Sequence, residues 1–125
     1  MPLTIYGIRN CDTMKKALAF LEAAGVAHHF HDYRKAGVPE EALRRWCRQL
    51  GWEEVLNRRG TTYRRLAGDE RARLDEEGAI RFMLHQPSAI RRPVLEGKGL
   101  LLAGFSEARY AEALPVTGLG TGEGA

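Results

Sequence analysis

The first third of the chain alternates short apolar runs with one stretch of helical periodicity. The run Leu3–Ile8 is rich in β-branched and aromatic residues and predicts a strand. From Asp12 onward, apolar residues recur every three or four positions up to Gly25, which predicts a helix that ends there. The segment Val26–Tyr33 predicts a second strand. A strand, a helix and a strand within about thirty residues indicate a βαβ unit.

The middle of the chain has the pattern of several short helices. Pro39 and two glutamates open a helix that runs to Leu50 and ends at Gly51. The stretch Trp52–Leu56 predicts another helical turn, and Asn57–Tyr63 predicts a loop.

Two more helices are predicted after this loop. Asp69–Glu77 is charged and helix-prone, and Ala79–Leu84 follows Gly78 and is stopped by Pro87.

The last part of the chain predicts a hairpin and a closing helix. The apolar runs Val94–Leu95 and Leu100–Ala103 are separated by Glu96–Gly99, which is typical of a hairpin turn. Ser106 is the expected N-cap of a helix over Glu107–Leu114. The glycine-rich residues 115–125 show no periodicity, so we expect a flexible tail.

This order of elements predicts an α/β fold with one mixed sheet covered by helices. The sheet would be built from a β-α-β unit followed by β-β-α. We expect a single domain over residues 1–114, with an all-helical insertion at about 38–88.

Composition fits such a domain. The chain has 125 residues, 44% hydrophobic and 28% charged, as in soluble globular proteins. No apolar run is long enough for a membrane span, and the N-terminus shows no secretory signal. Two cysteines argue against a disulfide scaffold and for a cytoplasmic location. The net charge of +3 comes from arginine pairs interleaved with glutamates, so we expect no nucleic-acid partner. We also expect no membrane partner and a monomer, because nothing in the sequence demands an oligomer.

Cys11 is the residue with the clearest chemical signal. It lies between the first predicted strand and the first predicted helix, where unpaired backbone N–H groups and the helix dipole favour a thiolate. A pKa decrease of about two units requires roughly 2.7 kcal/mol, whereas a helix terminus supplies about 0.3–1 kcal/mol. A cation must therefore help, and Arg9 is the local candidate, while Asp12 opposes the effect. The alternative is an inert, half-buried cysteine.

Other polar residues allow two interpretations. Asn10 and Thr13 flank the thiol and either orient a ligand or cap the helix. Cys47 lies on the apolar face of a predicted helix and is expected to be a packed core thiol. His29 and His31 share one face of a predicted strand, but two histidines do not make a zinc site, so we expect no metal.

Four ordered motifs resemble the ArsC family. Asn10-Cys11 is followed by Thr13 and Lys15-Lys16-Ala17, as in the family's nucleophile loop. The later motifs keep the family's order and spacing over about Leu3 to Leu114, and with Phe30-His31-Asp32-Tyr33-Arg34 the similarity is closest to the YffB-like branch. They are Asn57-Arg58-Arg59-Gly60-Thr61-Thr62-Tyr63, Phe82-Met83-Leu84-His85-Gln86-Pro87 and Ile90-Arg91-Arg92-Pro93.

The resemblance implies a thioredoxin-like fold with a helical insertion and a nucleophilic Cys11. It also implies a cis peptide bond before Pro93, with Arg92 brought to Cys11 as the missing cation. Arsenate-reducing members place three arginines around the oxyanion; Arg92 matches one and Arg59, or else Arg58, a second. The third position falls near Gly104, which has no side chain to bind an oxyanion.

The resemblance also bears on how the reaction would be completed. Dithiol thioredoxins carry a resolving cysteine three residues after the nucleophile, where this chain has Met14. An external thiol must then resolve any adduct. The expected activity is a glutathione-dependent thiol reductase, with glutathione as co-substrate and no tightly bound cofactor. The alternatives are an arsenate reductase and a non-enzymatic regulator like the Spx-type family members, which bind RNA polymerase.

Overall fold

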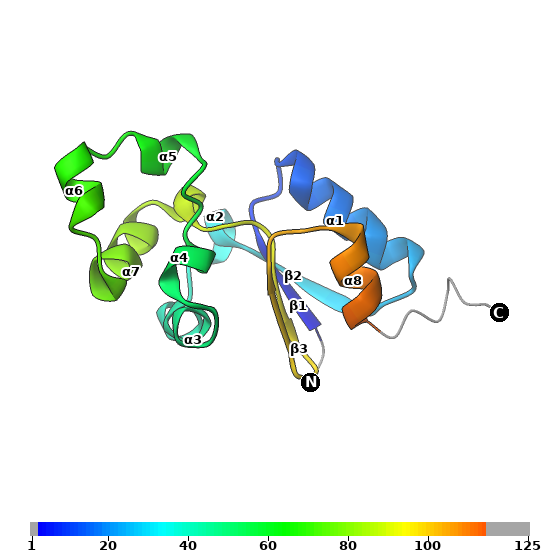
Figure 1. Cartoon of the computed structure of the whole chain (residues 1–125). Coiled ribbons are helices and arrows are strands. Elements are labelled where there is room, and N and C mark those ends of the chain that lie inside the picture. The colour runs from blue at the N-terminus through cyan, green and yellow to red at the C-terminus, as the bar shows by residue number, and fades with distance from the viewer. Residues whose placement is uncertain (1–2, 115–125) are drawn as a thin grey trace. The chain divides into compact units, whose positions relative to one another are not determined.

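The computed structural model describes residues 3–114 and contains two compact units (Figure 1). The sheet unit consists of the described residues up to Lys35 and from Arg92 onward; the helical unit is Ala36–Arg91. The insertion expected at about 38–88 lies within the helical unit. The grouping of residues 1–114 into one domain stays a prediction, and the tail expected at 115–125 lies outside the described residues.

The sheet unit is built on a four-stranded mixed sheet. Its strands lie in the order β2-β1-β3-β4, and β1 pairs with β2 in parallel. The β1–β3 and β3–β4 pairs are antiparallel, as a βαβ unit followed by a hairpin predicts. The strands are β1 Leu3–Gly7, β2 His28–Asp32, β3 Val94–Gly97 and β4 Leu100–Ala103.

Two helices cover the same face of this sheet, α1 (Asp12–Ala23) and α8 (Glu107–Ala113) (Figure 1). The alternation of β1 sends Leu3 and Ile5 to this face. The helices contribute residues at helical spacing, and the Ser106 hydroxyl accepts a hydrogen bond from the Arg109 N–H at 3.0 Å, as the predicted cap requires. The buried cluster consists of Leu3, Ile5, Met14, Ala17, Leu21, Leu95, Tyr110 and Leu114.

The hairpin turn is shorter than the sequence predicted. Glu96 and Gly97, expected in the turn, pair with Leu101 and Leu100 on β4. The turn is only Lys98–Gly99, and both residues have positive φ, 51° and 79°. Positive φ at both central residues is the type I′ geometry, which matches the twist of the flanking strands.

The second strand ends one residue before the prediction. Tyr33 begins a short helix, α2 (Tyr33–Ala36), instead of ending the strand. The Asp32 carboxylate accepts a hydrogen bond from the Arg34 N–H at 2.9 Å, and such a bond turns the backbone away from extended structure.

The helical unit contains five α-helices and one 3-10 turn within Ala36–Arg91. Arg44 joins its first and last α-helices, because its guanidinium donates to both carboxylate oxygens of Glu77 at 2.9 Å while also pairing with Glu40. The elements are α3 Glu40–Leu50, α4 Trp52–Val55, α5 Thr61–Arg64, α6 Gly68–Ala72, α7 Glu76–His85 and the 3-10 turn Pro87–Ala89.

Two predictions for this unit were wrong. The expected loop Asn57–Tyr63 runs into α5, which forms although threonine favours helices poorly; the Thr62 hydroxyl is hydrogen bonded to that of Ser88 at 2.8 Å. The expected helix Asp69–Glu77 is interrupted after α6. Asp75 accepts a hydrogen bond from the Gly78 N–H at 2.8 Å and caps α7, so Gly78 lies inside that helix.

Replacing Gly7 by alanine tests the packing of α1 on β1. A Cβ at Gly7 would collide with the Met14 sulfur, so we expect Gly7→Ala to lower the free energy of unfolding by about 1–3 kcal/mol, measured by urea unfolding. In a Met14→Ala background the clash is absent, and the same substitution should cost much less. Equal decreases in the free energy of unfolding in the two backgrounds would show that contact with Met14 is not the reason that residue 7 must be glycine.

Candidate active site

Four chain segments meet at one end of the sheet. β1 and β2 are parallel, with Gly7 opposite Asp32, so the segments that follow them leave at the same end. β3 runs the other way, with Val94 opposite both Tyr6 and Ala103. The segment before β3 and the segment after β4 therefore lie at this end as well. This end of the sheet therefore carries Cys11, Tyr33, the Arg92-Pro93 pair and Gly104.

Cys11 is the N-cap residue of α1, as predicted for a thiol presented at a helix start. Its backbone is extended, with φ −144° and ψ 129°, and its side chain is half-buried. The side chain makes no cap hydrogen bond. The first-turn N–H groups of α1 are therefore left to stabilise negative charge on the sulfur.

The pKa of the Cys11 thiol is lowered from its ordinary value by the groups around it. Burial is the largest single effect and raises the pKa. The Met14 N–H, a hydrogen bond from the Arg92 side chain, the Thr13 N–H and the Arg92 charge together outweigh it. This balance favours the interpretation of Cys11 as a reactive thiol, because a thiol governed by burial alone would have a raised pKa.

Arg92 and Pro93 lie as the family resemblance implied. The Arg92–Pro93 peptide bond is cis, and Arg92 is the cation that acts on Cys11. The carbonyl of Pro93 accepts a hydrogen bond from the Gly104 N–H at 2.8 Å. Gly104 has φ +81°, in the left-handed region that glycine adopts without strain. The chain therefore has no side chain at this position, and an arginine placed there would have a strained backbone.

Three other predicted site residues lie next to Cys11 in the chain. Arg9, the expected local cation, is exposed and lies over the Phe30 ring, 5.1 Å from its centroid, and does not lower the Cys11 pKa. Asn10 and Thr13 are exposed, and neither caps α1 through its side chain. Substrate binding by Arg9, Asn10 and Thr13 stays a prediction.

Arg58 and Arg59 belong to the helical unit and are both exposed. They lie just before α5, and the Arg59 N–H donates a hydrogen bond to the Asn57 side chain at 3.3 Å. Their role as oxyanion ligands, with Arg59 favoured, stays a prediction.

No second thiol accompanies Cys11 on α1. Met14 occupies the resolving position and is fully buried in the core. Cys47 lies in the helical unit and is 2% exposed; burial and, secondarily, Glu76 raise its pKa to about 11, with Arg44 opposing them. Cys47 is thus the packed core thiol that the sequence predicted, and it is unreactive near neutral pH.

Two of the three histidines of β2, His28 and His31, have ordinary partners. His28 Nδ1 is hydrogen bonded to the Val26 carbonyl at 2.8 Å, and His31 packs against Tyr6 with ring centroids 5.1 Å apart. Within residues 3–114, no cluster of three or more histidine, cysteine or acidic side chains could hold a metal ion.

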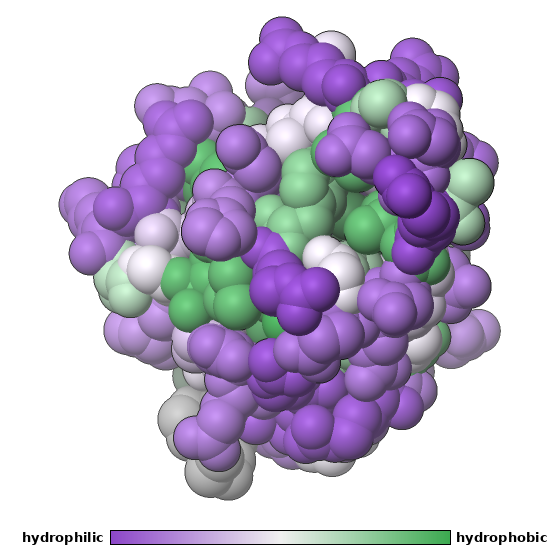
Figure 2. Space-filling model, turned by 90° about the vertical axis from the view of Figure 1, so that its left-hand side faces the viewer, coloured by the Kyte–Doolittle hydropathy of each residue, from purple (hydrophilic) through white to green (hydrophobic). Residues whose placement is uncertain are grey.

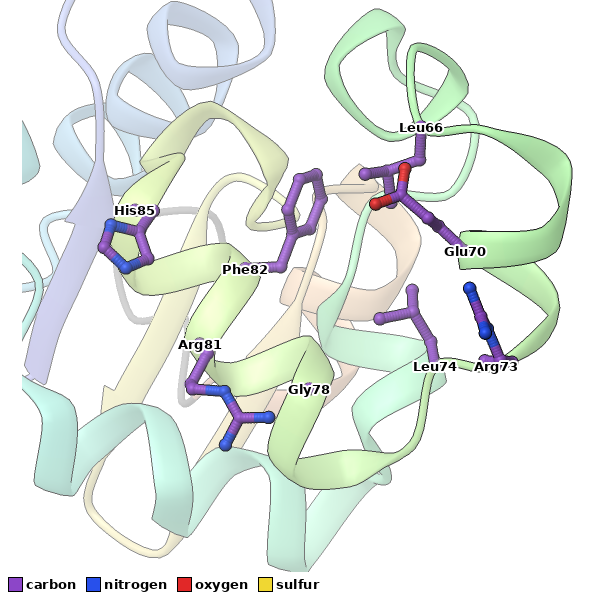
Figure 3. A pocket seen from close by; sticks show the side chains of 8 residues that line it. All are labelled: Leu66, Glu70, Arg73, Leu74, Gly78, Arg81, Phe82 and His85. Carbon is purple, nitrogen blue, oxygen red and sulfur yellow. The ribbon is translucent and has the colours of Figure 1, made fainter.

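A pocket of about 410 Å³ in the helical unit is a second candidate for ligand binding (Figure 3). Figure 2 views the side that carries α5 to α7, where apolar surface is surrounded by hydrophilic side chains. No cysteine lines the pocket, and its lining mixes apolar and charged groups. It therefore lacks the thiol chemistry of the sheet unit. The lining residues are Leu66, Glu70, Arg73, Leu74, Gly78, Arg81, Phe82 and His85.

One residue at the active-site end was missed by the sequence analysis. Tyr33, expected to end a strand, is only 3% exposed and lies close enough to Arg92 for the guanidinium charge to act on its hydroxyl. A tyrosine in a short segment of aromatic residues and histidines gives no signal that distinguishes a site residue from a packing residue.

Comparison with known proteins agrees with this geometry. The ArsC family model matches residues 6–113. The chain belongs to the ArsC family. A solved structure of a protein named YFFB is 54% identical, with a TM-score of 0.85, covering 90% of this chain and 98% of that one. This likeness confirms the resemblance to the YffB-like branch and the thioredoxin-like α/β fold. An uncharacterized protein of Haemophilus influenzae is 39% identical over 111 residues, 89% of this chain and 97% of its own.

More distant relatives carry two different functional names. An arsenate reductase from Vibrio cholerae is 25% identical, with a TM-score of 0.77, covering 91% of this chain and 98% of that one. The global transcriptional regulator Spx of Streptococcus agalactiae is 25% identical over 115 residues, 90% of this chain and 83% of its own.

Replacing Arg92 tests its effect on the thiol. Without the guanidinium the pKa of Cys11 rises, so Arg92→Leu should shift the pH profile of iodoacetamide alkylation at Cys11 to higher pH and slow alkylation several-fold at pH 7. Site-resolved mass spectrometry gives the rate. Arg92→Lys keeps a positive charge and should shift the profile less. Arg9→Leu is the matched control and should leave it unchanged; an equal shift in both leucine variants would rule out a specific role for Arg92.

Proposed function

We propose that this protein is a small cytoplasmic thiol reductase that uses glutathione and a single nucleophilic cysteine. The observation that carries the proposal is Cys11 at the start of α1, half-buried, with a pKa lowered by Arg92 and by two backbone N–H groups. A thiolate in such a place attacks disulfide sulfur faster than an ordinary thiol does, because the thiolate is the nucleophile. Membership in the ArsC family supports the same chemistry.

The proposed cycle has two exchange steps. The Cys11 thiolate attacks the sulfur of a glutathione mixed disulfide, and a bond forms between Cys11 and the glutathionyl sulfur. The substrate sulfur leaves as a thiolate and takes a proton from solvent. A second glutathione, as thiolate, then attacks the adduct, forms oxidised glutathione and releases Cys11 as thiolate. The substrate disulfide is reduced by two electrons, which glutathione supplies.

Two features of the site support an external thiol as the reductant. Met14 replaces a resolving cysteine, and Cys47 is buried with a raised pKa. Glutathione carries carboxylates, and Arg92 beside Cys11 offers them a charge-assisted hydrogen bond. The family resemblance implies that Pro93 exposes backbone to the ligand, but Pro93 is buried, has no N–H group and already accepts a hydrogen bond from Gly104 through its carbonyl, so any backbone contact with the peptide part would come from its neighbours. No tightly bound cofactor, no nucleic acid and no membrane partner enter this proposal, and the protein acts as a monomer.

No helix among the described residues is long and apolar enough to cross a bilayer.

Arsenate reduction is a second candidate, favoured by the likeness to the Vibrio cholerae enzyme. Arsenate is an anion that needs several charge-assisted hydrogen bonds, each worth about 1.5–3 kcal/mol. Gly104, with its left-handed backbone, offers no side chain for one of them. Disulfide substrates make no such demand, which is why thiol reduction ranks first.

A regulator without enzymatic activity is a third candidate, favoured by the likeness to Spx. The Spx-type redox switch needs a CxxC pair, and Met14 removes it from this chain. Polymerase binding without thiol turnover would support this candidate against the first.

The decisive experiment compares two cysteine variants. Cys11→Ser should reduce glutathione-dependent reduction of a mixed disulfide to the uncatalysed rate, because serine is not a nucleophile at neutral pH. Cys47→Ser is the matched control and should keep turnover. The readout is coupled NADPH oxidation by glutathione reductase, with circular dichroism to verify the fold of both variants. Full turnover by Cys11→Ser would eliminate the mechanism, and turnover with arsenate exceeding that with disulfides would move the second candidate to first place.

A further inference from the structure

Arg9 presents an accessible guanidinium that an aromatic ring holds in place. It is exposed, and it lies over the Phe30 ring at 5.1 Å from the ring centroid. Among residues 3–114, no hydrogen bond or ion pair occupies this guanidinium. An arginine stacked on an aromatic ring has less side-chain freedom to lose when it binds an anion, because the ring already restricts it. Arg9 therefore offers a partly ordered cation to a ligand.

The strand register places this cation on the same face of the sheet as the thiol. Phe30 is paired with Ile5, and Ile5 points toward the core cluster under α1 and α8. Cys11 and Phe30 are both half-buried, and both pack against this cluster. The Arg9 guanidinium, which lies over Phe30, is thus on the side of the sheet that carries α1 and the thiol at its start.

The backbone keeps Arg9 close to Cys11. Only Asn10 separates the two residues, and the Cys11 N–H donates a hydrogen bond to the Arg9 carbonyl at 3.0 Å. A bond between residues two apart closes a three-residue turn, which fixes the backbone within it. With about 3.8 Å between consecutive Cα atoms, the Cα atoms of Arg9 and Cys11 are at most about 7.6 Å apart.

Arg9 and Arg92 lie over different neighbours of the strand that leads to Cys11. β1 pairs with β2 on one side and with β3 on the other. Arg9 lies over Phe30 of β2, whereas Arg92 comes just before β3. Arg92 acts directly on the sulfur of Cys11, and Arg9 is not among the groups that do. Arg9 is therefore left for a part of the ligand that lies farther from the reacting sulfur.

We propose that Arg9, held in place by Phe30, binds a carboxylate of the thiol or disulfide that reacts with Cys11, and that it makes the site prefer anionic ligands. The ligand class is a peptide-sized thiol or disulfide whose carboxylate lies several bonds from its sulfur, as in glutathione. The guanidinium donates a charge-assisted hydrogen bond to this carboxylate. This inference rests on the proposed thiol chemistry at Cys11.

The test compares a disulfide that carries carboxylates, oxidised glutathione, with a neutral one, bis(2-hydroxyethyl) disulfide. The rate constant of adduct formation at Cys11 is measured by intact mass with each disulfide in excess. In both reactions the Cys11 thiolate attacks one sulfur and forms an S–S bond to it, while the other sulfur leaves as a thiolate and takes a proton from solvent. In Arg9→Leu we expect the rate constant with oxidised glutathione to fall about fivefold, as for the loss of one exposed charged contact. The rate constant with the neutral disulfide should change by less than about twofold.

Two further variants separate the place of the charge from its presence. Lys16→Leu is the matched control, because it removes an exposed positive charge from α1 that is not stacked on a ring. It should change both rate constants by less than about twofold. Phe30→Leu keeps the charge of Arg9 and removes the ring, so we expect the rate constant with oxidised glutathione to fall about two- to threefold. Circular dichroism verifies the fold of each variant.

Three results would overturn the proposal. The first is an unchanged rate constant with oxidised glutathione in Arg9→Leu or in Phe30→Leu. The second is an equal slowing with both disulfides in Arg9→Leu, which would assign Arg9 to thiol reactivity. The third is an equal loss in Lys16→Leu, which would show that any nearby positive charge has the same effect. If Cys11 forms no adduct in the original protein, the proposed function itself fails instead.

Discussion

The chemistry of this protein depends on one electrostatic balance, the charge of a half-buried sulfur at the start of a helix. Burial favours the neutral thiol of Cys11, and the free N–H groups of α1 together with the Arg92 guanidinium favour the thiolate. A helix end alone supplies only about 0.3–1 kcal/mol, and Arg92 adds a hydrogen bond and a charge. The arginine that supplies this charge comes from a distant part of the sequence, and the pairing of β3 with β1 brings it to Cys11.

The strand register makes this delivery reliable. Arg92 lies 81 residues after Cys11 in the chain, yet Val94 pairs with Tyr6, so the segment before β3 is held beside the segment after β1. A one-residue slip in β3 would turn Leu95 out of the core, at a cost of about 1.5–3 kcal/mol for that side chain alone. Packing of the sheet face that α1 and α8 cover thus maintains the geometry of the thiol.

Residue patterns predicted the parts of this structure that local physics determines. The apolar spacing of α1, the cap at Ser106 and the place of Cys11 between strand and helix are local signals, and the structure has all three. The start of α5 at Thr61 was missed, and there the Thr62 hydroxyl bonds to Ser88, far along the chain. The break after α6 was missed although Asp75 is a local N-cap signal for α7. Arg9 was the best cation that proximity in sequence could offer, and its stacking on Phe30 depends on a neighbouring strand. The role of Arg92 came from family resemblance, because no local pattern relates residue 92 to residue 11.

The residues beside the thiol restrict which reactions the site can complete. Met14 is buried against Gly7, so the position that would hold a resolving cysteine is part of the core. The backbone at Gly104 is left-handed, so the position that would hold a third oxyanion ligand has no side chain. A nucleophile without an internal resolving thiol forms adducts that another molecule must release. The proposed exchange with a small external thiol fits a site in which Met14 removes dithiol exchange and Gly104 weakens oxyanion binding.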